Sequence, residues 1–406
     1  MIDRNNVARE KIIRAAQLMR QADIGMWVFY SRLKQDPALE LMFNTDTREE
    51  VLMALTSSGD CHAFVPAVCL AQFEASGLYK EVSAADSSQI MPAFKALFDA
   101  QMVSRLALNC SPEDSRCDGL GLGLYHKLRD AIGEETMARV KTCSFTMLEE
   151  LRAVKTSSEI AIMTECNRLT TDIYDAVFSQ LHVGLSETEI GDLLVRECRL
   201  RGVGSGLGDP DAYPLVLLVK GGMFHRGPDA GNIALPGDMM VIDFSVRYND
   251  YTSDVARTVY FLRQGEQRAP ETVRRCVKAS VDAVSACAAF IRPGVLGHQV
   301  DEVGRGAIVS SGYPSFPHST GHQVGLEVHD GGTLLGQTGR PGSQRALRKD
   351  EIYAIEPTVL QDILPDGTVL PCAIVEDEWI VTENGCRLIN PEKRQLDVVE
   401  IPYTEA

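Results

Sequence analysis

The stretch "MMVIDFSVRYNDYTSDVARTVYF", residues 239–261, decides the fold. Two segments rich in β-branched and aromatic residues flank the polar "RYND", and this pattern predicts a β-hairpin. A turn centred on Tyr248 and Asn249 would place Asp243 directly opposite Asp254. Because side chains alternate across a strand, both carboxylates would share one face and repel each other. The apolar neighbours of both aspartates indicate a buried hairpin, which favours a cation site over two solvated aspartates.

Three further residues downstream have the side chains that a metal site uses. Glu356 lies in "IYAIEPTVL", Glu376 in "CAIVEDEWIVT" and His322 in "HSTGHQVGLEVHD". A glutamate within an apolar strand is costly to bury unless it is paired or coordinated. Either glutamate alone could face water at a sheet edge. Two such glutamates in addition to the aspartate pair make it less plausible that all of them are simply exposed. Four carboxylates balance two divalent cations, and an oxygen-rich set with one imidazole suits manganese, cobalt, iron or zinc without choosing among them.

The chain length and an internal repeat predict the domain organisation. A chain of 406 residues is too long for one ordinary core and predicts two domains, the first a small α/β unit of 150 residues. After residue 150, an order of helix, helix and strands occurs twice. Three residue pairs match across the repeat, each 110 residues apart: Gly184 with Gly294, Ile190 with Val300, and Gly202 with Gly312. This repeat predicts a pseudo-symmetric domain with packed sheets and outer helices.

Composition excludes several classes of function. The net charge of −16 disfavours nucleic-acid binding, because an acidic chain repels phosphate backbones. No apolar run approaches the length of a membrane-spanning helix, and the charged N-terminal segment has no signal-peptide core. The eleven cysteines are odd in number and contain no C-x-x-C pair, so reduced thiols in the cytoplasm are expected.

The ordered motifs resemble those of the pita-bread metallopeptidases, and more narrowly the Xaa-Pro dipeptidase (prolidase) and aminopeptidase P branch. The resemblance covers about residues 150–395 and rests on Asp243, Asp254, "HSTGHQVGLEVHD", "IEPT" and "VEDEWIVTENG". It implies an α+β, two-domain α/β chain. Residues 1–150 would form a creatinase-like N-terminal domain, and residues 151–406 a pseudo-symmetric pita-bread catalytic domain. Methionine aminopeptidases usually lack such a front domain, and creatinase lacks the five metal ligands.

The resemblance also implies a two-metal mechanism. Asp243 would hold one metal, His322 and Glu356 the other, and Asp254 and Glu376 would bridge both. A hydroxide between the metals would attack the carbonyl that precedes proline, with Glu356 as the proton shuttle. Manganese is the expected metal, with cobalt or zinc as alternatives.

The remaining functional residues follow from the same resemblance. His329 and His225 match histidines that contact the substrate or lie over the site. His318 either contacts the metal ligands from behind without binding metal itself or is simply packed. The chain differs from the family pattern at two arginine positions. Family members commonly carry an arginine where this chain has Ile374, and the arginine that holds a dipeptide's carboxylate is missing from its usual segment. Arg226, or an arginine in residues 340–348, could replace the latter.

We therefore expect a cytoplasmic enzyme, a two-metal Xaa-Pro dipeptidase acting on small peptides with proline in the second position. An aminopeptidase P acting on longer peptides is the nearest alternative, and a family member turned to a non-peptide amide is a more distant one. A non-catalytic pita-bread binding protein is the alternative from another class, but such proteins typically lose ligands. The resemblance further implies a homodimer, with no nucleic-acid or membrane partner.

Overall fold

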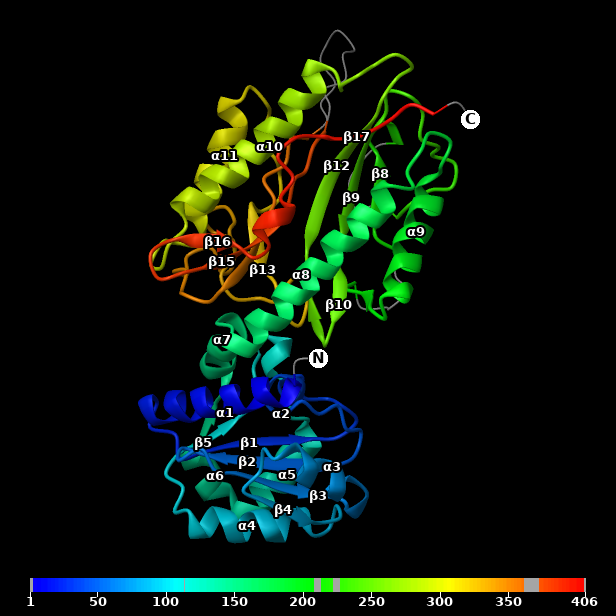
Figure 1. Ribbon diagram of the computed structural model, residues 1–406. Helices are drawn as coiled ribbons and strands as arrows, with labels where there is room; N and C mark the ends of the chain where they lie inside the picture. The colour runs from blue at the N-terminus through cyan, green and yellow to red at the C-terminus, as the bar shows by residue number, and fades with distance from the viewer. Residues whose placement is uncertain (1–2, 113, 208–212, 222–226, 361–371, 405–406) are drawn as a thin grey trace. The chain divides into compact units, whose positions relative to one another are not determined.

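The structure, a computed structural model, is mixed α/β and forms two compact units (Figure 1). It describes residues 3–112, 114–207, 213–221, 227–360 and 372–404. The first unit comprises Met1–Arg152 with Thr156–Ser158, and the second comprises Ala153–Lys155 with Glu159–Ala406. Among the described residues, no helix is both long enough and apolar enough to cross a membrane.

The first unit contains a six-stranded sheet in the order β4-β3-β2-β1-β5-β6. Central strand β1 pairs antiparallel with β2 and parallel with β5, and all its residues are buried. The strands are β1 (Met26–Ser31), β2 (Val51–Thr56), β3 (Cys61–Val65), β4 (Glu81–Ala84), β5 (Leu106–Leu108) and β6 (Lys141–Cys143). The helices are α1 (Arg4–Gln21), α2 (Ala38–Phe43), α3 (Leu70–Ser76), α4 (Ile90–Ala100), α5 (Leu122–Ile132), α6 (Glu134–Val140) and α7 (Phe145–Ala153), which ends at the unit boundary.

The second unit contains two four-stranded sheets, β17-β12-β9-β8 and β13-β14-β15-β16, and a small sheet β11-β10-β7. Its strands are β7 (Gly204–Ser205), β8 (Leu215–Leu218), β9 (Met239–Phe244), β10 (Val246–Tyr248), β11 (Tyr251–Thr252), β12 (Val255–Phe261), β13 (Gly321–Gln323), β14 (Ile352–Ile355), β15 (Asp377–Val381), β16 (Cys386–Leu388) and β17 (Val399–Ile401). Its helices are α8 (Ser157–Phe178), α9 (Glu187–Leu200), α10 (Glu271–Phe290) and α11 (Gly297–Ser310).

The repeat of 110 residues is present in the second unit. Helices α9 and α11 begin and end at positions exactly one repeat apart. The glycines before them, Gly184 and Gly294, have φ angles of 94° and 90°. The glycines after them, Gly202 and Gly312, have φ angles of 67° and 88°. These left-handed conformations are costly for residues with a Cβ, which is why glycine recurs at matching positions.

Strand alternation sorts the side chains of both four-stranded sheets onto two faces. In β9 and β12, Ile242 and Val259 pack in one core with residues of α8 and α9. In β14, Tyr353 and Ile355 pack in one core with residues of α10. Figure 1 shows α8 and α9 beside one sheet and α10 and α11 beside the other. The intervening residues of β9, which include Asp243, therefore face away from the core that β9 shares with α8 and α9, and those of β14 face away from the core shared with α10. We call these the inner faces.

The hairpin of residues 239–261 forms, but its predicted register was wrong. Tyr248 pairs with Tyr251, so the turn is Asn249–Asp250 rather than Tyr248–Asn249. Both turn residues have positive φ, 51° and 70°, as the two-residue hairpin turn requires, and Asn and Asp tolerate this conformation better than Tyr does. Asp243 consequently lies opposite Ala256 instead of Asp254. A shift of two residues preserves the face, so both aspartates still lie on the inner face.

Candidate metal centre

The two aspartates come from the β9–β12 hairpin. Asp243 is near the end of β9, and Asp254 lies in the break just before β12. The side chain of Asp254 is buried, and its Oδ1 accepts a hydrogen bond of 3.2 Å from Ser245 Oγ. Asp243 lies opposite Ala256, two residues from Asp254, and the charges of Asp254 and Glu356 both act on its carboxylate.

The two glutamates face each other at the end of the other sheet. Both were predicted within apolar strands, but Glu356 directly follows β14 and Glu376 directly precedes β15. The last pair of that ladder is Ile355 with Asp377, so the glutamates occupy the next opposed positions. The Glu356 amide donates to Thr320 O at 2.8 Å, and the Glu376 amide donates to Ala256 O at 3.1 Å. The second bond joins the two sheets and fixes Glu376 against the aspartate hairpin.

His322 supplies the nitrogen of the cluster. It lies in β13, with its Nδ1 3.2 Å from Gln323 O. Its Nε2 is 3.3 Å from Asp254 Oδ2 and 3.9 Å from Glu356 Oε1. One donor atom each from Asp254, His322 and Glu376 lie within 4.8 Å of one another. The structure therefore brings together all five residues that the sequence singled out as ligands.

The electrostatics of this cluster fit a site for cations. Burial raises the pKa of Asp243 well above its usual range, and the charges of Asp254 and Glu356 raise it further. Glu376 shows the same direction for the same reasons, and burial raises the pKa of Glu356 to about 7. Burial alone would lower the pKa of His322, but the hydrogen bond and charge of Asp254 outweigh it and raise it to about 9. Without a cation, the mutual repulsion of these carboxylates is relieved only when they bind protons. A set of buried oxygen donors with one imidazole therefore suits divalent metals.

His329 lies beside the cluster without belonging to the buried set. Its ring centroid is 4.1 Å from that of His322, and its side chain is exposed. The next residue, Asp330, is buried; its amide donates to Gln323 O at 2.9 Å, and its Oδ2 is 3.0 Å from Lys155 Nζ. This loop therefore holds His329 at the edge of the cluster with its ring accessible.

The other predicted histidines and the predicted arginine have different outcomes. His318 packs its ring on Phe316 at 4.8 Å, and its Nδ1 is 2.8 Å from Ser319 O. Its role beside the ligands stays a prediction. His225 and Arg226 lie outside the described residues, so their roles also stay predictions.

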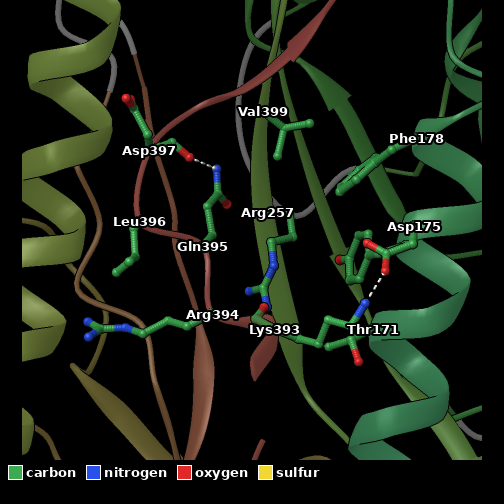
Figure 2. Close-up of a pocket in the computed structure, with 11 residues that line it drawn as sticks. Thr171, Asp175, Phe178, Arg257, Lys393, Arg394, Gln395, Leu396, Asp397 and Val399 are labelled. Atoms are coloured by element: carbon green, nitrogen blue, oxygen red, sulfur yellow. Dashed lines mark hydrogen bonds and ion pairs between the residues drawn. The ribbon is translucent and has the colours of Figure 1, made fainter. Parts of the chain in front are cut away.

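Arg257 holds the backbone of Glu376 and the side chain of Asp377, in a chain that has Ile374 where the family commonly has an arginine. It is buried on β12, and its Nη1 donates to Glu376 O at 2.8 Å while its Nη2 donates to Asp377 Oδ1 at 2.8 Å. Figure 2 shows Arg257 within a pocket between α8 and residues 393–399. Ile374 is buried, and its amide donates to Thr258 Oγ1 at 3.0 Å. Arg257 was not singled out from the sequence. It could have been found as a charged residue within the otherwise apolar strand "VARTVYF".

Glu378 is a further buried carboxylate that the sequence reasoning missed. It lies on the inner face of β15, opposite Ala354, which in turn is opposite His322. Its Oε2 accepts a hydrogen bond of 2.5 Å from Asn167 Nδ2, and burial raises its pKa well above the usual range. The signal was the run "EDE", whose alternation places the first and third acids on one face.

Comparison with known proteins identifies the family. The sequence profile of metallopeptidase family M24 matches residues 161–383, more than half of the 406-residue chain. The chain belongs to family M24. The pita-bread resemblance seen in the motifs is thereby confirmed.

Individual M24 relatives are more distant. The chain is 28% identical over 256 residues to an uncharacterized peptidase of Bacillus subtilis, covering 62% of this chain and 66% of the relative. It is 26% identical over 258 residues to an Xaa-Pro dipeptidase of Pyrococcus furiosus, again covering 62% of this chain and 66% of the relative. The matched region thus spans slightly less than two thirds of these curated M24 proteins.

Solved structures confirm the predicted two-domain pita-bread fold. An X-Pro aminopeptidase from Thermotoga maritima superposes with a TM-score of 0.71 at 19% identity, covering 96% of this chain and 99% of that one. An Xaa-Pro dipeptidase from Bacillus anthracis gives a TM-score of 0.72 at 20% identity, covering 97% and 99%. A putative aminopeptidase P from Bacillus anthracis gives 0.74 at 16% identity, covering 97% and 96%. At these identities the likeness concerns the fold of this M24 member alone.

Proposed function

We propose that this M24 protein is a two-metal Xaa-Pro dipeptidase. The observation that carries the proposal is the convergence of four carboxylates and His322 on the facing inner sides of two sheets. Asp243 would hold one metal, His322 and Glu356 the other, and Asp254 and Glu376 would bridge them. Manganese is the proposed metal, with cobalt or zinc as alternatives. Such cations supply a nucleophile at neutral pH and polarise the scissile carbonyl.

Three side chains would assist the metals in catalysis, by proton transfer, by stabilisation of the oxyanion and by positioning of a ligand. Glu356 is only partly buried, with 22% of its side chain exposed, so it can both hold a metal and exchange a proton with the substrate nitrogen. His329 offers an exposed ring next to His322, where it could donate a hydrogen bond to the oxygen of the scissile carbonyl as negative charge develops there. Arg257 would orient Glu376 through its backbone carbonyl rather than touch the substrate.

The substrate class is proposed as small peptides with proline in the second position. A Pyrococcus furiosus relative is an Xaa-Pro dipeptidase, which supports this choice. Aminopeptidase P activity on longer peptides is the second candidate, favoured by the lack of a basic residue between Pro357 and Val375. We infer a cytoplasmic location because all eleven cysteines are free thiols. The homodimer stays a prediction.

Hydrolysis of a peptide panel tests this function. The panel contains Xaa-Pro, Xaa-Ala and Xaa-Pro-Xaa peptides, each assayed with manganese, cobalt and zinc. We expect the highest kcat/KM for Xaa-Pro. A preference for the tripeptide would replace dipeptidase with aminopeptidase P. Full metal binding without cleavage of any peptide would instead support a family member acting on a non-peptide amide, and less than one tightly bound ion per chain would support the non-catalytic binding protein.

Arg226 is the proposed partner of the dipeptide carboxylate. Substitution Arg226→Ala should raise the KM for Xaa-Pro while leaving the KM for an amidated Xaa-Pro unchanged, because the amide has no charge to bind. Equal effects on both substrates would remove Arg226 from this role.

A further inference from the structure

Two cysteine thiols meet at one edge of the first unit's sheet. Cys143 ends the edge strand β6, and Cys110 lies two residues beyond the end of the adjacent strand β5. The strands are parallel, with Leu108 paired to Cys143, so both cysteines leave the sheet at the same corner. Cys143 is exposed and Cys110 is partly buried.

The Cys143 thiol lies against the backbone of Cys110. The Cys110 amide donates to Leu108 O at 3.0 Å, which turns the chain back toward β6 immediately after β5 ends. Cys143 Sγ then lies only 2.6 Å from the carbonyl oxygen of Cys110, and the Phe145 amide donates to the same sulfur at 3.4 Å. Burial raises the pKa of the Cys110 thiol. The charge of Cys143 and a hydrogen bond with its side chain raise this pKa further, as expected for two sulfurs that lie close together.

We propose that Cys110 and Cys143 form a peroxide-sensitive thiol pair that closes to an intramolecular disulfide. A disulfide requires a Cα separation of about 4.4–6.8 Å, and the contact of 2.6 Å between Cys143 Sγ and Cys110 O brings the Cys143 side chain against the Cys110 backbone. The pair lies in the first unit, whereas the five candidate metal ligands lie in the second. The proposal is therefore independent of the peptidase function.

The oxidation balances with a hydroperoxide as the oxidant. The exposed Cys143 thiolate attacks one oxygen of hydrogen peroxide, the O–O bond breaks, and the departing hydroxide takes up a proton as water. Cys143 is then a sulfenic acid, oxidised by two electrons, and the peroxide is reduced. The sulfur of Cys110 attacks the Cys143 sulfur, the S–O bond breaks, and a second water leaves with the proton of the Cys110 thiol. Two thiols and one peroxide thus give one disulfide and two waters.

The surroundings favour this pair over the other thiols. Of the eleven cysteines, only Cys143 is exposed, so it meets an aqueous oxidant first. Cys117 also lies close enough to feel the charge of Cys143, but it is 2% exposed and burial raises its pKa to about 12. Cys386 of the second unit is partly exposed but has the fully buried Cys287 as its thiol neighbour. Cys386 therefore provides a matched control.

Peptide mapping of the full chain tests the pair. The protein is treated with hydrogen peroxide, alkylated, digested without reductant and analysed by mass spectrometry. We expect one Cys110–Cys143 cross-linked peptide, two hydrogens lighter than the reduced pair, and a loss of two thiols from eleven that dithiothreitol reverses. The Cys386→Ser variant should give the same cross-link. In Cys110→Ser, dimedone should trap a sulfenic acid at Cys143, because the second thiol is gone.

Several outcomes would overturn the proposal. These are a Cys143–Cys117 cross-link, a disulfide between two chains, irreversible sulfinic acid at Cys143 of the wild type, or no loss of thiols. The cross-link is read on the wild-type protein, so the result does not depend on whether a serine variant folds. A closed disulfide should also raise the unfolding midpoint of the first unit, because it closes a loop that contains α5 and α6.

Discussion

The buried ion pair between Lys155 and Asp330 permits a quantitative prediction. Lys155 Nζ lies 3.0 Å from Asp330 Oδ2, and each side chain is only 1% exposed. At an effective dielectric constant of about 20, two unit charges at this separation attract by roughly 5.5 kcal/mol. Removing one partner takes the ion pair away from the other charge while that charge stays buried, which typically costs about 3–5 kcal/mol. Lys155→Met should therefore destabilise the second unit by about that amount.

Tryptophan placement allows each unit to be followed separately. Trp27 lies in the first unit and Trp379 in the second, and these are the only tryptophans of the chain. Fluorine NMR of fluorotryptophan-labelled protein during urea unfolding would thus give one transition per unit. At an m value of about 3 kcal/mol per molar urea, the Trp379 midpoint should fall by about 1–1.7 M, while the Trp27 midpoint stays unchanged.

Two further variants separate charge burial from other effects. The double variant Lys155→Met with Asp330→Asn should recover at least half of the lost stability, because neither side chain is then charged. The Lys393–Asp175 pair is a matched control: its side chains are 39% and 57% exposed, so Lys393→Met should leave the midpoint unchanged. If Lys155→Met shifts the Trp379 midpoint no more than Lys393→Met does, the reasoning about this buried pair is refuted.

Three other predictions concern the metal centre and the first unit. Glu376→Gln removes a proposed bridging carboxylate and should lower turnover by roughly 100-fold or more, with fewer than two metals bound per chain. The control Glu383→Gln, on an exposed loop, should change neither turnover nor metal content. Normal turnover in Glu376→Gln would disprove the role of Glu376. His329→Ala should lower kcat by roughly 100-fold with metal content unchanged, and loss of metal instead would make it a ligand. Burial raises the pKa of Asp36 to about 6, so its protonated form is favoured on folding and the first unit should lose stability as pH rises from about 4 to 6. The loss should be about 3 kcal/mol when wild type is compared with Asp36→Asn by Trp27 fluorine NMR, and parallel pH profiles would contradict it.

The clustering of the candidate ligands and the repeat could be predicted because they depend on residue type and spacing. Gly184 and Gly294 occupy positions that require positive φ, so the repeat is visible in the sequence itself. Asp243 and Asp254 could be assigned to one face because alternation survives a shift of two residues. Their pairing could not be assigned, since it depends on which two residues of "RYND" adopt the left-handed conformation.

Side chains that reach across sheets could not be predicted from local pattern. Arg257 supports Glu376, although 119 residues separate them along the chain. The hydrogen bond between Asn167 and Glu378 spans 211 residues and joins α8 to β15. Such contacts follow from how the helices and sheets pack, which a strand's own alternation does not encode.

The number of metal ions bound per chain tests most directly whether the five residues form a two-metal centre. Chelator-treated protein should be titrated with manganese by isothermal calorimetry, with the bound ions then counted by mass spectrometry. We expect two ions per chain in the wild type and fewer than two in Asp254→Asn, which lacks a proposed bridging charge. Less than one tightly bound ion per chain in the wild type, or an unchanged count in Asp254→Asn, would contradict the account.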